Sequence, residues 1–480
     1  MRVGFLIDRW QPERGGAERA LAALAEHLER QGHEVLAFGL YGPRPDHPAP
    51  GHFERVSVPA WTHLSRGARE RALGAALIAG AADAGCDVTI GVRHLPRVDL
   101  YWPHGGSHAA NLVALAKARA VAKAVVKGQP LPDLAELEAQ AVEKARGRHK
   151  TFLDLERRLL EGGGAKRVVC VSGVVEAELA EAYPEISDRL TRVENGVDVE
   201  RFHPRERARA RELLVAELGD EKRKGDKGKD AAAKADGDKE QGEQGRDATP
   251  QAGARGPILS LVARNPELKG LPTLIEALAG LKDKDWHLFV AGSKDVRRWK
   301  GPVKRAGLEG RVTLHANLDP VTLAAGSDLY VLPSWRDPGP LVVLESLASG
   351  TPVVTTKLSG GSELIQPGVA GAVIERPGDP ESLREALATW IDRTGAGEVD
   401  RDAVRACVRG RDATSWLARL EKIVVSLAKE SRAETGQGET PPSEPPRAQR
   451  GDSLDEGEEQ DPPAALPSST ETDAEADATR

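Results

Sequence analysis

Two cations stand in a segment that could bind a phosphate group. Arg264 and Lys269 follow the apolar run 258–262, which predicts a buried strand. Ligands of open α/β folds bind outside the carboxyl ends of such strands. An arginine offers a fork of donors and a lysine a point charge, so the two could clamp a pyrophosphate. The alternative is a solvated loop, where an isolated Arg/Lys pair lies more often than in a phosphate site.

Two carboxylates bracket a second candidate segment, which runs from Asp337 to Glu345. Asp337 would lie near the start of a helix, and Glu345 two turns into it, directly after the apolar run 341–344. An acid in this place could accept hydrogen bonds from sugar hydroxyls, and a buried Glu345 would need a partner. The alternative is one acid that favours the helix dipole and one surface glutamate.

Two glycines and a histidine mark a third candidate region. Gly15 and Gly16 follow the apolar run 3–7 and open a predicted helix, where backbone N–H groups favour a phosphate. The spacing is not GxGxxG, so the nicotinamide and flavin fingerprint is absent. His104 follows a predicted strand, 99–102, and could hydrogen-bond an acceptor or take its proton. The alternatives are an ordinary strand–helix turn and a surface or core histidine.

A basic stripe runs along the helix predicted over 109–127. Arg119, Lys123 and Lys127 recur at i, i+4 and i+8, and Ala and Val fill the neighbouring sector. A basic amphipathic helix can lie on anionic lipid. The alternative is a solvated helix that packs on its own domain through Ala and Val, and the absence of aromatic residues favours it.

Alternating strands and helices must position these side chains, and that alternation predicts parallel, doubly wound sheets. In the first half the expected strands are 3–7, 34–38, 88–92, 99–102 and 167–171. In the second half they are 258–262, 287–291, 312–315, 329–332, 352–355 and 372–374. The expected helices include 17–31, 109–127, 271–281, 321–325, 341–349, 381–391 and 414–429.

Charge and composition divide the 480 residues into unlike parts. The formal net charge is −7, but residues 431–480 alone hold 13 Asp/Glu and 4 Arg, so the remainder is close to neutral. That excludes a strongly basic nucleic-acid binder. Residues 219–257 contain no large apolar side chain, and both segments have the composition of disordered chain.

Cysteine usage and the N-terminus bear on the compartment. The 3 cysteines lie far apart without a CxxC pair, which excludes a disulfide scaffold and a cysteine zinc site. The N-terminal apolar run is too short for a secretory signal, and no window approaches a membrane span. We therefore expect a cytoplasmic protein, either soluble or peripheral on the inner face of the cell membrane.

Taken together, these motifs resemble family 4 of the retaining GT-B glycosyltransferases. Within that family the chain is similar to the lipopolysaccharide core glucosyltransferase I group, through 96–101, the basic segment after it and the helix 152–160. The segments that carry the family resemblance are 15–19, 169–172, 193–198 with Phe202 and Pro204, Arg264 with 269–270, 332–334, 337–345 and 350–354.

The resemblance implies two Rossmann-like domains that face a cleft, and it implies roles for the site residues. The donor would be a nucleotide-diphospho-sugar, UDP-linked, with its pyrophosphate on Arg264 and Lys269 and its ribose on Glu345. Asp337 and the loop of Gly339, Pro340 and Leu341 would hold the sugar. Gly15 and Gly16 would approach the phosphates, and His104 would line the acceptor side. His104, Arg264, Lys269 and Asp337 are the expected catalytic residues.

This sequence departs from the family pattern at two positions of the donor loop. The first acid of the usual Glu-x7-Glu is Asp337, one methylene shorter, and a glycine common in that loop is Pro340, which lacks an N–H donor. The departures leave the choice of donor sugar open. No metal or other cofactor is expected, because cations and helix termini supply the positive charge.

The resemblance also sets the expected domains and function. The domains are an acceptor-side domain over 1–204, an entering helix over 205–218, the insertion 219–257, a donor domain over 258–411, a final helix over 412–430 that crosses back, and the tail 431–480. The expected reaction is transfer of a hexose, with glucose favoured, to a glycan or glycolipid that could be lipopolysaccharide core. The alternatives are a non-catalytic nucleotide-sugar-binding or scaffold protein, and another nucleotide-sugar reaction on the same fold.

Overall fold

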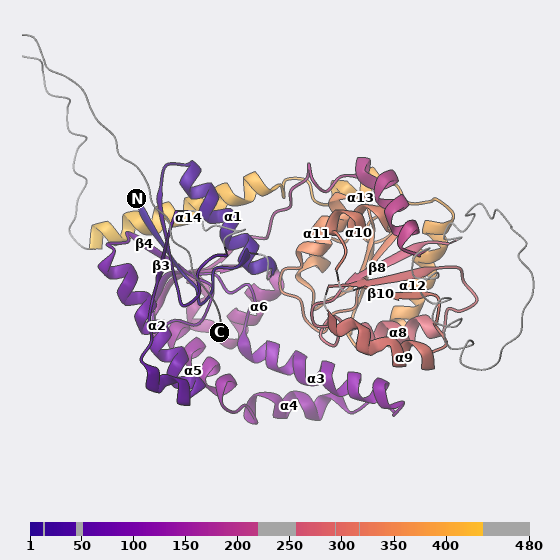
Figure 1. Cartoon of the computed structure of the whole chain (residues 1–480), viewed down its shortest axis with the longest axis horizontal. Coiled ribbons are helices and arrows are strands. Elements are labelled where there is room, and N and C mark those ends of the chain that lie inside the picture. Colours follow the sequence, from indigo (N-terminus) through magenta and orange to yellow (C-terminus); the bar gives the residue numbers. More distant parts are fainter. Residues whose placement is uncertain (13–14, 45–50, 219–255, 293, 316, 435–480) are drawn as a thin grey trace, which may run out of the picture. The chain divides into compact units, whose positions relative to one another are not determined.

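The computed structural model describes two sheets and the helices around them (Figure 1). The described residues are 1–12, 15–44, 51–218, 256–292, 294–315 and 317–434. The insertion predicted at 219–257 lies outside them except for its last two residues. The acidic tail predicted at 431–480 lies outside them except for 431–434, which continue the last helix.

The first domain is built on a parallel sheet of seven strands in the order β3-β2-β1-β4-β5-β6-β7. Its interior strand β1 is buried because Val3, Phe5 and Leu6 meet helices on both faces. The strands are β1 (Arg2–Leu6), β2 (Glu34–Gly39), β3 (His52–Arg55), β4 (Val88–Gly91), β5 (Val98–Tyr101), β6 (Ala165–Cys170) and β7 (Leu190–Arg192).

The crossover helices of this domain follow from their apolar periodicity. In the first of them, Leu21, Leu24 and Leu28 recur at helical spacing and are buried against the sheet. The helices are α1 (Gly16–Arg30), α2 (Arg66–Asp83), α3 (His108–Lys127), α4 (Leu134–Glu143), α5 (Arg148–Leu160) and α6 (Gly173–Ala182), with the 3-10 turns η2 (Ala60–Leu64) and η3 (Pro184–Arg189).

The second domain repeats the plan with a parallel sheet of six strands in the order β10-β9-β8-β11-β12-β13. Its strands are β8 (Ile258–Val262), β9 (His287–Ala291), β10 (Val312–Leu314), β11 (Leu329–Leu332), β12 (Val353–Thr356) and β13 (Gly371–Ile374). Its helices are α8 (Leu271–Ala279), α9 (Lys300–Arg305), α10 (Pro320–Gly326), α11 (Leu341–Ala348), α12 (Pro380–Gly395) and α13 (Arg401–Ala406), with the turns η4 (Pro204–Glu206), η5 (Lys294–Trp299) and η6 (Gly360–Leu364).

The predicted pair of parallel, doubly wound sheets is therefore confirmed, although two strands went unpredicted. Both β3 and β7 are edge strands with partly exposed residues. The strands β3 (HFER) and β7 (LTR) are short and mostly polar, so neither carries an apolar run that would reveal it.

The chain crosses between the domains twice, and the two crossings touch. Val197 on the way out pairs with Arg411 and Ala413 on the way back, through backbone hydrogen bonds of 2.9 and 3.0 Å. Gly196 permits this approach, because a Cβ there would lie 2.7 Å from the Cβ of Trp416.

The last helix, α14 (Ala413–Glu434), returns to the first domain. Trp416, Leu420 and Val424 are buried in the same apolar cluster as the strands β1, β4 and β5. On its polar side Glu421 lies 2.8 Å from the Nε2 atom of His27 on α1. The helix predicted from one broad apolar face thus completes the core of the domain in which the chain began.

In the described residues, no helix is long and apolar enough to cross a membrane.

Replacing Leu420 with alanine is expected to destabilise the first domain. The side chain is wholly buried in that core. Loss of its methylene groups and the resulting cavity should lower the free energy of unfolding by about 2–5 kcal/mol. Denaturant titration of the full chain would measure the change. The matched control, Lys422→Ala, lies on the exposed side of the same helix and should change the value by less than about 0.5 kcal/mol. Equal effects of the two substitutions would contradict this account of α14.

Candidate active site

A cavity of about 460 Å³ lies where the two domains meet. The carboxyl ends of β1 and β5 contribute from the first domain, and those of β8, β9 and β11 from the second. All the residues predicted for catalysis or donor binding line it: Gly15, Gly16, His104, Arg264, Lys269, Asp337, Gly339, Pro340, Leu341 and Glu345. The structure thus brings together side chains that are up to 330 positions apart in the sequence.

Lys269 and Asp337 form an ion pair with each other in the cavity wall. Lys269 ends the loop after β8, and the next residue, Gly270, has a φ of +77°. A Cβ on Gly270 would lie 2.0 Å from the carbonyl oxygen of Pro333, so only glycine lets the two loops meet. The sequence suggested separate partners for this lysine and this aspartate, whereas the structure makes them partners of one another.

Arg264 lies close to the glycine turn of the first domain. A Cβ on Gly15 would stand 3.9 Å from its Nη1 atom. A Cβ on Gly16 would stand 3.1 Å from the Cδ1 atom of Leu341, which begins α11. The absence of a side chain on Gly16 therefore lets the start of α1 approach the donor loop closely.

The donor loop, residues 337–341, is held mainly through its backbone. The Asp337 carbonyl accepts a hydrogen bond of 2.8 Å from the amide of Gly360. The hydroxyl of Ser172 donates to the Pro338 carbonyl at 2.6 Å, and the amide of Asn195 donates to the Gly339 carbonyl at 3.1 Å. Pro338 lacks an N–H group, but its carbonyl is used, so first-domain side chains support a loop of the second domain.

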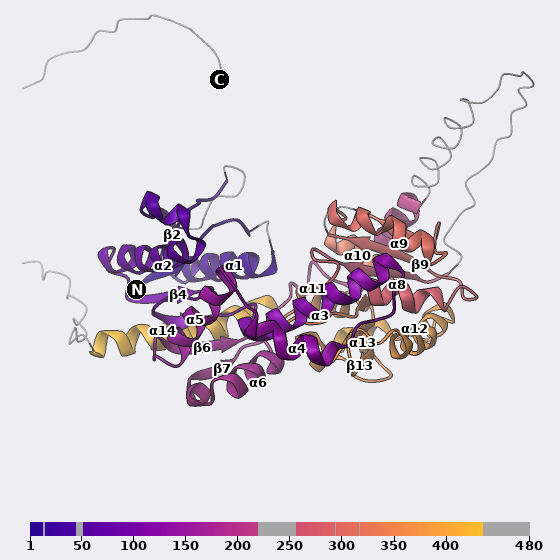
Figure 2. The same ribbon diagram turned by 90° about the horizontal axis from the view of Figure 1, so that it is seen from below.

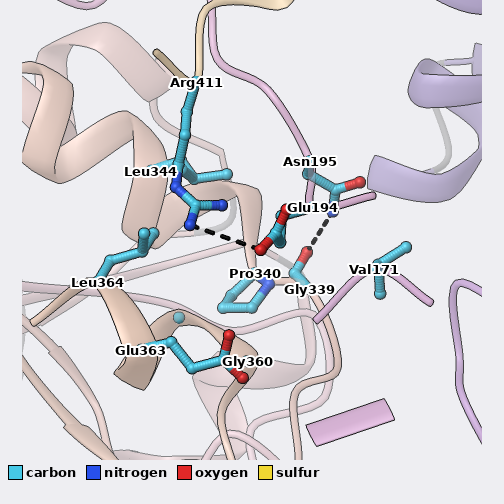
Figure 3. Close-up of a pocket in the computed structure, with 11 residues that line it drawn as sticks. Val171, Glu194, Asn195, Gly339, Pro340, Leu344, Gly360, Glu363, Leu364 and Arg411 are labelled. Carbon is cyan, nitrogen blue, oxygen red and sulfur yellow. Dashed lines mark hydrogen bonds and ion pairs between the residues drawn. The ribbon is translucent and has the colours of Figure 1, made fainter. Parts of the chain in front are cut away.

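A smaller cavity of about 20 Å³ lies behind this loop (Figure 3). Arg411 forms an ion pair of 3.6 Å with Glu194, and the neighbouring Asn195 reaches the Gly339 carbonyl (Figure 3). Glu194 and Arg411 belong to the outgoing and returning crossings of the chain. The crossings are therefore connected directly to the donor loop.

Glu345 is a buried carboxylate on α11, with 6% of its surface exposed. Burial raises the pKa of this carboxyl above its ordinary value, and the positive charge of Arg19 opposes the shift. The Nη2 atom of Arg19, on α1, lies 3.9 Å from the carboxylate. The partner that a buried Glu345 requires is thus supplied by the first domain, which sequence reasoning did not identify.

His104 presents a neutral imidazole to the cavity. Its ring packs against Trp102, with centroids 4.2 Å apart and the ring planes tilted by 40°. Burial lowers the pKa of His104 to about 3, so the ring is uncharged at neutral pH. Its Nε2 atom is buried without a hydrogen-bond partner among the described residues. A buried, unpaired ring nitrogen can position a hydroxyl group, but a group with so low a pKa is a weak base.

Arg336 was not predicted, and it joins the two sides of the site. Its guanidinium donates to both carboxylate oxygens of Glu178 on α6, at 2.9 and 2.5 Å. A third donor reaches the Gly105 carbonyl, directly after His104, at 2.6 Å. Gly106, with φ +58°, makes room, since a Cβ there would be 2.3 Å from Nη2. Arg336 and Glu178 are 158 residues apart, so no local sequence pattern indicates that they form a pair.

The basic stripe of α3 lies outside this cavity. Arg119, Lys123 and Lys127 are exposed, as the amphipathic interpretation required. Apart from the exposed Val126, the neighbouring apolar sector is buried, because Ala118, Val121, Ala122 and Val125 join the core cluster of the second domain. The helix lies beside α4 (Figures 1 and 2) and reaches α8. The alternative prediction was that α3 packs on its own domain through Ala and Val. It is wrong in one respect, because the apolar sector of α3 packs against the second domain.

No described group of three or more His, Cys, Asp or Glu residues is arranged to hold a metal ion.

Comparisons with known proteins match both halves of the chain. Residues 14–201 match the model of Glycosyltransferase Family 4, and residues 248–405 match that of Glycosyl transferases group 1. The chain is 23% identical over 391 residues to lipopolysaccharide glucosyltransferase WaaG of Escherichia coli K12, covering 81% of this chain and 88% of that protein. It is 30% identical over 278 residues to D-inositol 3-phosphate glycosyltransferase of Arthrobacter sp. FB24, covering 55% and 56% of the two chains.

Solved structures share the fold. The crystal structure of WaaG aligns with a TM-score of 0.64 at 19% identity, covering 88% of this chain and 99% of that one. That of Anabaena Alr3699/HepE in complex with UDP-glucose aligns with a TM-score of 0.59 at 18% identity, covering 89% and 100%.

Removing the Arg336 guanidinium should destabilise the junction of the domains. Arg336→Met leaves Glu178 without its partner, and a broken buried ion pair costs about 3–5 kcal/mol. We expect a value near 3 kcal/mol, because a fifth of the Glu178 side chain stays exposed. Thermal or denaturant unfolding of the full chain would measure it. The double variant with Glu178→Leu should recover part of the loss, which a double-mutant cycle would quantify.

The control for this cycle is an exposed ion pair of similar length. Lys357 and Glu375 are 3.0 Å apart, and about two thirds or more of each side chain is exposed. Lys357→Met should therefore change the free energy of unfolding by less than about 1 kcal/mol. A loss as small as this for Arg336→Met would show that the buried pair does not stabilise the junction.

Glu345→Gln should stabilise the protein near neutral pH. Burial raises the pKa of Glu345, so the folded state holds a proton on this carboxyl that the unfolded state has released, and stability falls as pH rises between the two pKa values. Glutamine has no charge to bury. The stability gap between variant and parent should therefore be largest at pH 7–8 and shrink toward pH 4, where the acid is protonated in both states. Melting temperatures across this range would test it, and a pH-independent gap would contradict it.

Proposed function

Because this chain is a glycosyltransferase of the GT-B fold, with a family 4 domain followed by a group 1 domain, we propose that it transfers a hexose with retention of configuration. The donor is a UDP-linked hexose, with glucose favoured, and the acceptor is a glycan or lipid-linked glycan, with lipopolysaccharide core as the first candidate. One observation supports this most directly. Three cations, two acids and a glycine turn line a single cavity at the carboxyl ends of both sheets.

The comparisons favour these substrates over others. The relative that covers most of the chain among those described above is named a lipopolysaccharide glucosyltransferase, and one structural neighbour holds UDP-glucose. The shared fold supports a nucleotide-sugar donor in the second domain. The choice of glucose and of the acceptor is the proposal's own extension.

The diphosphate would be bound by exchange of an ion pair. Lys269 and Asp337 neutralise each other in the structure. An arriving diphosphate offers Lys269 a stronger anion, and Asp337 is then released to accept hydrogen bonds from the sugar. Arg264 and the first backbone N–H groups of α11 supply further positive charge. This positive charge favours departure of the diphosphate without a metal, so we propose a metal-independent reaction.

The reaction itself breaks the bond between the anomeric carbon and the diphosphate oxygen. The electron pair leaves with the diphosphate, and an acceptor hydroxyl forms the new bond on the same face of the sugar. His104 has a pKa of about 3 and is too weak a base to take the hydroxyl proton. We therefore assign that proton to the departing phosphate oxygen. His104, which lines the cavity, would orient the acceptor hydroxyl without deprotonating it.

Glu345 is assigned to the nucleotide ribose. A buried carboxylate with a distant counter-charge at 3.9 Å has lone pairs left to accept hydrogen bonds from two hydroxyls. Hydrogen bonds from the ribose hydroxyls would compensate the carboxylate for part of the hydration that it loses on burial. Glu345 would thus destabilise the folded protein but bind the donor.

Peripheral contact with the inner face of the membrane belongs to the same proposal. The α3 stripe of Arg119, Lys123 and Lys127 is exposed, but its apolar sector is covered. Any contact through α3 would be electrostatic, without insertion of that sector into the bilayer.

A donor screen by mass spectrometry tests the proposed reaction. Purified full-length protein is incubated with UDP-, GDP- and ADP-sugars, and donor consumption and nucleotide release are followed. We expect UDP-glucose to be consumed. Lys269→Ala and Glu345→Ala should each lower turnover, the lysine substitution by about 10²–10³-fold, as for loss of one charge-stabilising donor.

The matched control is Lys300→Ala, an exposed lysine of the second domain outside the cavity. It should keep the parent's rate. Turnover close to that of the parent in both Lys269→Ala and Glu345→Ala would refute the site assignment. Consumption of a GDP- or ADP-sugar alone would refute the proposed donor while leaving the reaction class intact.

A further inference from the structure

One tryptophan in the chain is exposed, and the others are not. The sequence contains 8 tryptophans. Seven of them are at most 4% exposed, whereas Trp61 is 65% exposed. Leu64, one helical turn away on η2, is 93% exposed. In a protein with only 4% aromatic residues, leaving a tryptophan in water forgoes burial that the core could use.

Arginines lie near these two side chains in the sequence. Arg55 at the end of β3 and Arg66 and Arg71 at the start of α2 are exposed. A third large apolar side chain, Tyr41, is 40% exposed in the loop after β2. Its hydroxyl accepts a hydrogen bond of 3.0 Å from the Nη2 atom of Arg69 on α2. We call Tyr41, Trp61, Leu64 and these arginines the η2 patch.

The acidic residues of this region do not cancel the positive charge. Glu70 forms an ion pair with Arg93, which also lies 3.2 Å from Asp8. Glu54 is exposed at the end of β3 and is the acid left beside the patch among the described residues of 51–72. Arg55, Arg66, Arg69 and Arg71 therefore give this stretch a positive surface.

The position of the η2 patch in the fold relates it to the active site. η2 follows the carboxyl end of β3, and Tyr41 follows that of β2. In a parallel sheet these ends share one edge with those of β1 and β5, which carry Gly15 and His104 into the cavity. The patch thus lies on the edge of the first domain to which the acceptor side of the site also belongs.

We propose that the η2 patch docks on an anionic phospholipid bilayer. Trp61 and Leu64 would enter the headgroup region, where the amphipathic indole ring is favoured. Arg55, Arg66 and Arg71 would bind phosphate and other anionic headgroups. The exposed arginines have Glu54 as the acid left beside them, so the patch is complementary in charge to a layer of anionic headgroups. The η2 patch could bind a bilayer through both apolar insertion and attraction to headgroups. The α3 helix could supply the attraction alone, because its apolar sector is covered.

This inference gives the proposed membrane contact a surface, so it rests on that part of the proposed function, but it does not depend on the proposed reaction. Bilayer binding by the patch requires neither donor nor acceptor. An inactive protein that binds vesicles, and an active protein that does not, are distinguishable outcomes. Docking at this edge would place a lipid-linked acceptor near the cavity.

The experiment is vesicle co-sedimentation with the full-length protein. Phosphatidylcholine vesicles are compared with vesicles containing 30 mol% phosphatidylglycerol at about 50 mM salt. We expect binding to the anionic vesicles that weakens as salt is raised, since screening reduces headgroup attraction. Trp61→Ser/Leu64→Ser should lower the apparent affinity by at least about tenfold. Arg66→Gln/Arg71→Gln should weaken binding and flatten its salt dependence.

Tryptophan fluorescence provides a second readout of the same event. Since the other tryptophans are buried, quenching by brominated lipid should report Trp61. Trp61→Phe should therefore remove the quenching while retaining most of the binding. Circular dichroism melting of each variant checks folding, and these exposed substitutions should leave the melting temperature unchanged.

Two comparison variants separate the patch from other surfaces. Leu358→Ser changes a leucine of the second domain that is 43% exposed, and it should bind like the parent. Arg119→Glu/Lys123→Glu/Lys127→Glu tests α3, and the patch variant should lose more binding than this one. Unchanged binding of Trp61→Ser/Leu64→Ser would overturn the proposal, as would no binding to anionic vesicles. A concentration-dependent dimer that the patch variant abolishes would also overturn it in favour of self-association.

Discussion

Charges in a partly dehydrated junction must have counter-charges, and this constraint organises the structure between the two sheets. An unpaired buried charge costs several kcal/mol, so Arg336, Glu345 and Lys269 cannot be placed without partners. Their partners are Glu178 and Arg19 on the first domain and Asp337 on the donor loop. Two of the three pairs therefore join the domains, and the electrostatic requirement of each domain is met by the other.

The same constraint connects stability with catalysis. The pair of Lys269 and Asp337 is satisfied within the protein, yet each member is suited to a ligand, one to phosphate and the other to hydroxyl groups. Glu345 is less well satisfied, since its counter-charge lies 3.9 Å away and burial raises its pKa. Groups that are only partly compensated in the protein gain most from a substrate. Arg336, which donates two hydrogen bonds to Glu178 and one to Gly105, instead holds the surroundings in place.

The backbone is arranged to make these pairings geometrically possible. Gly196 lets the two crossings of the chain touch, Gly270 lets the loop after β8 meet Pro333, and Gly106 admits the arginine of the other domain. α14 then fixes the return crossing by burying its apolar face in the first domain. The glycines at these contacts and the helix α14 thus determine where the charged groups can lie.

Much of the architecture could be predicted from the sequence because apolar periodicity is a local property. β8, β9 and β11 lie where their apolar runs predicted them, whereas the edge strands β3 and β7 carried no such run. The candidate cavity residues could be named because a strand followed by a glycine, cation or acid is also a local pattern. Their roles in the reaction remain predictions, although the structure places them all around one cavity.

Only the tertiary structure decided which side chains meet, because pairing across long sequence distances leaves no local signal. The partnership of Lys269 with Asp337, the Arg336–Glu178 pair and the burial of the α3 apolar sector against the second domain are of this kind. Exposure is decided in the same way. Trp61 stands among apolar residues in the sequence like any core tryptophan, and only the packing of the whole first domain leaves it in solvent. By itself the sequence determined the two sheets, the helices between them and the chemistry available at the strand ends.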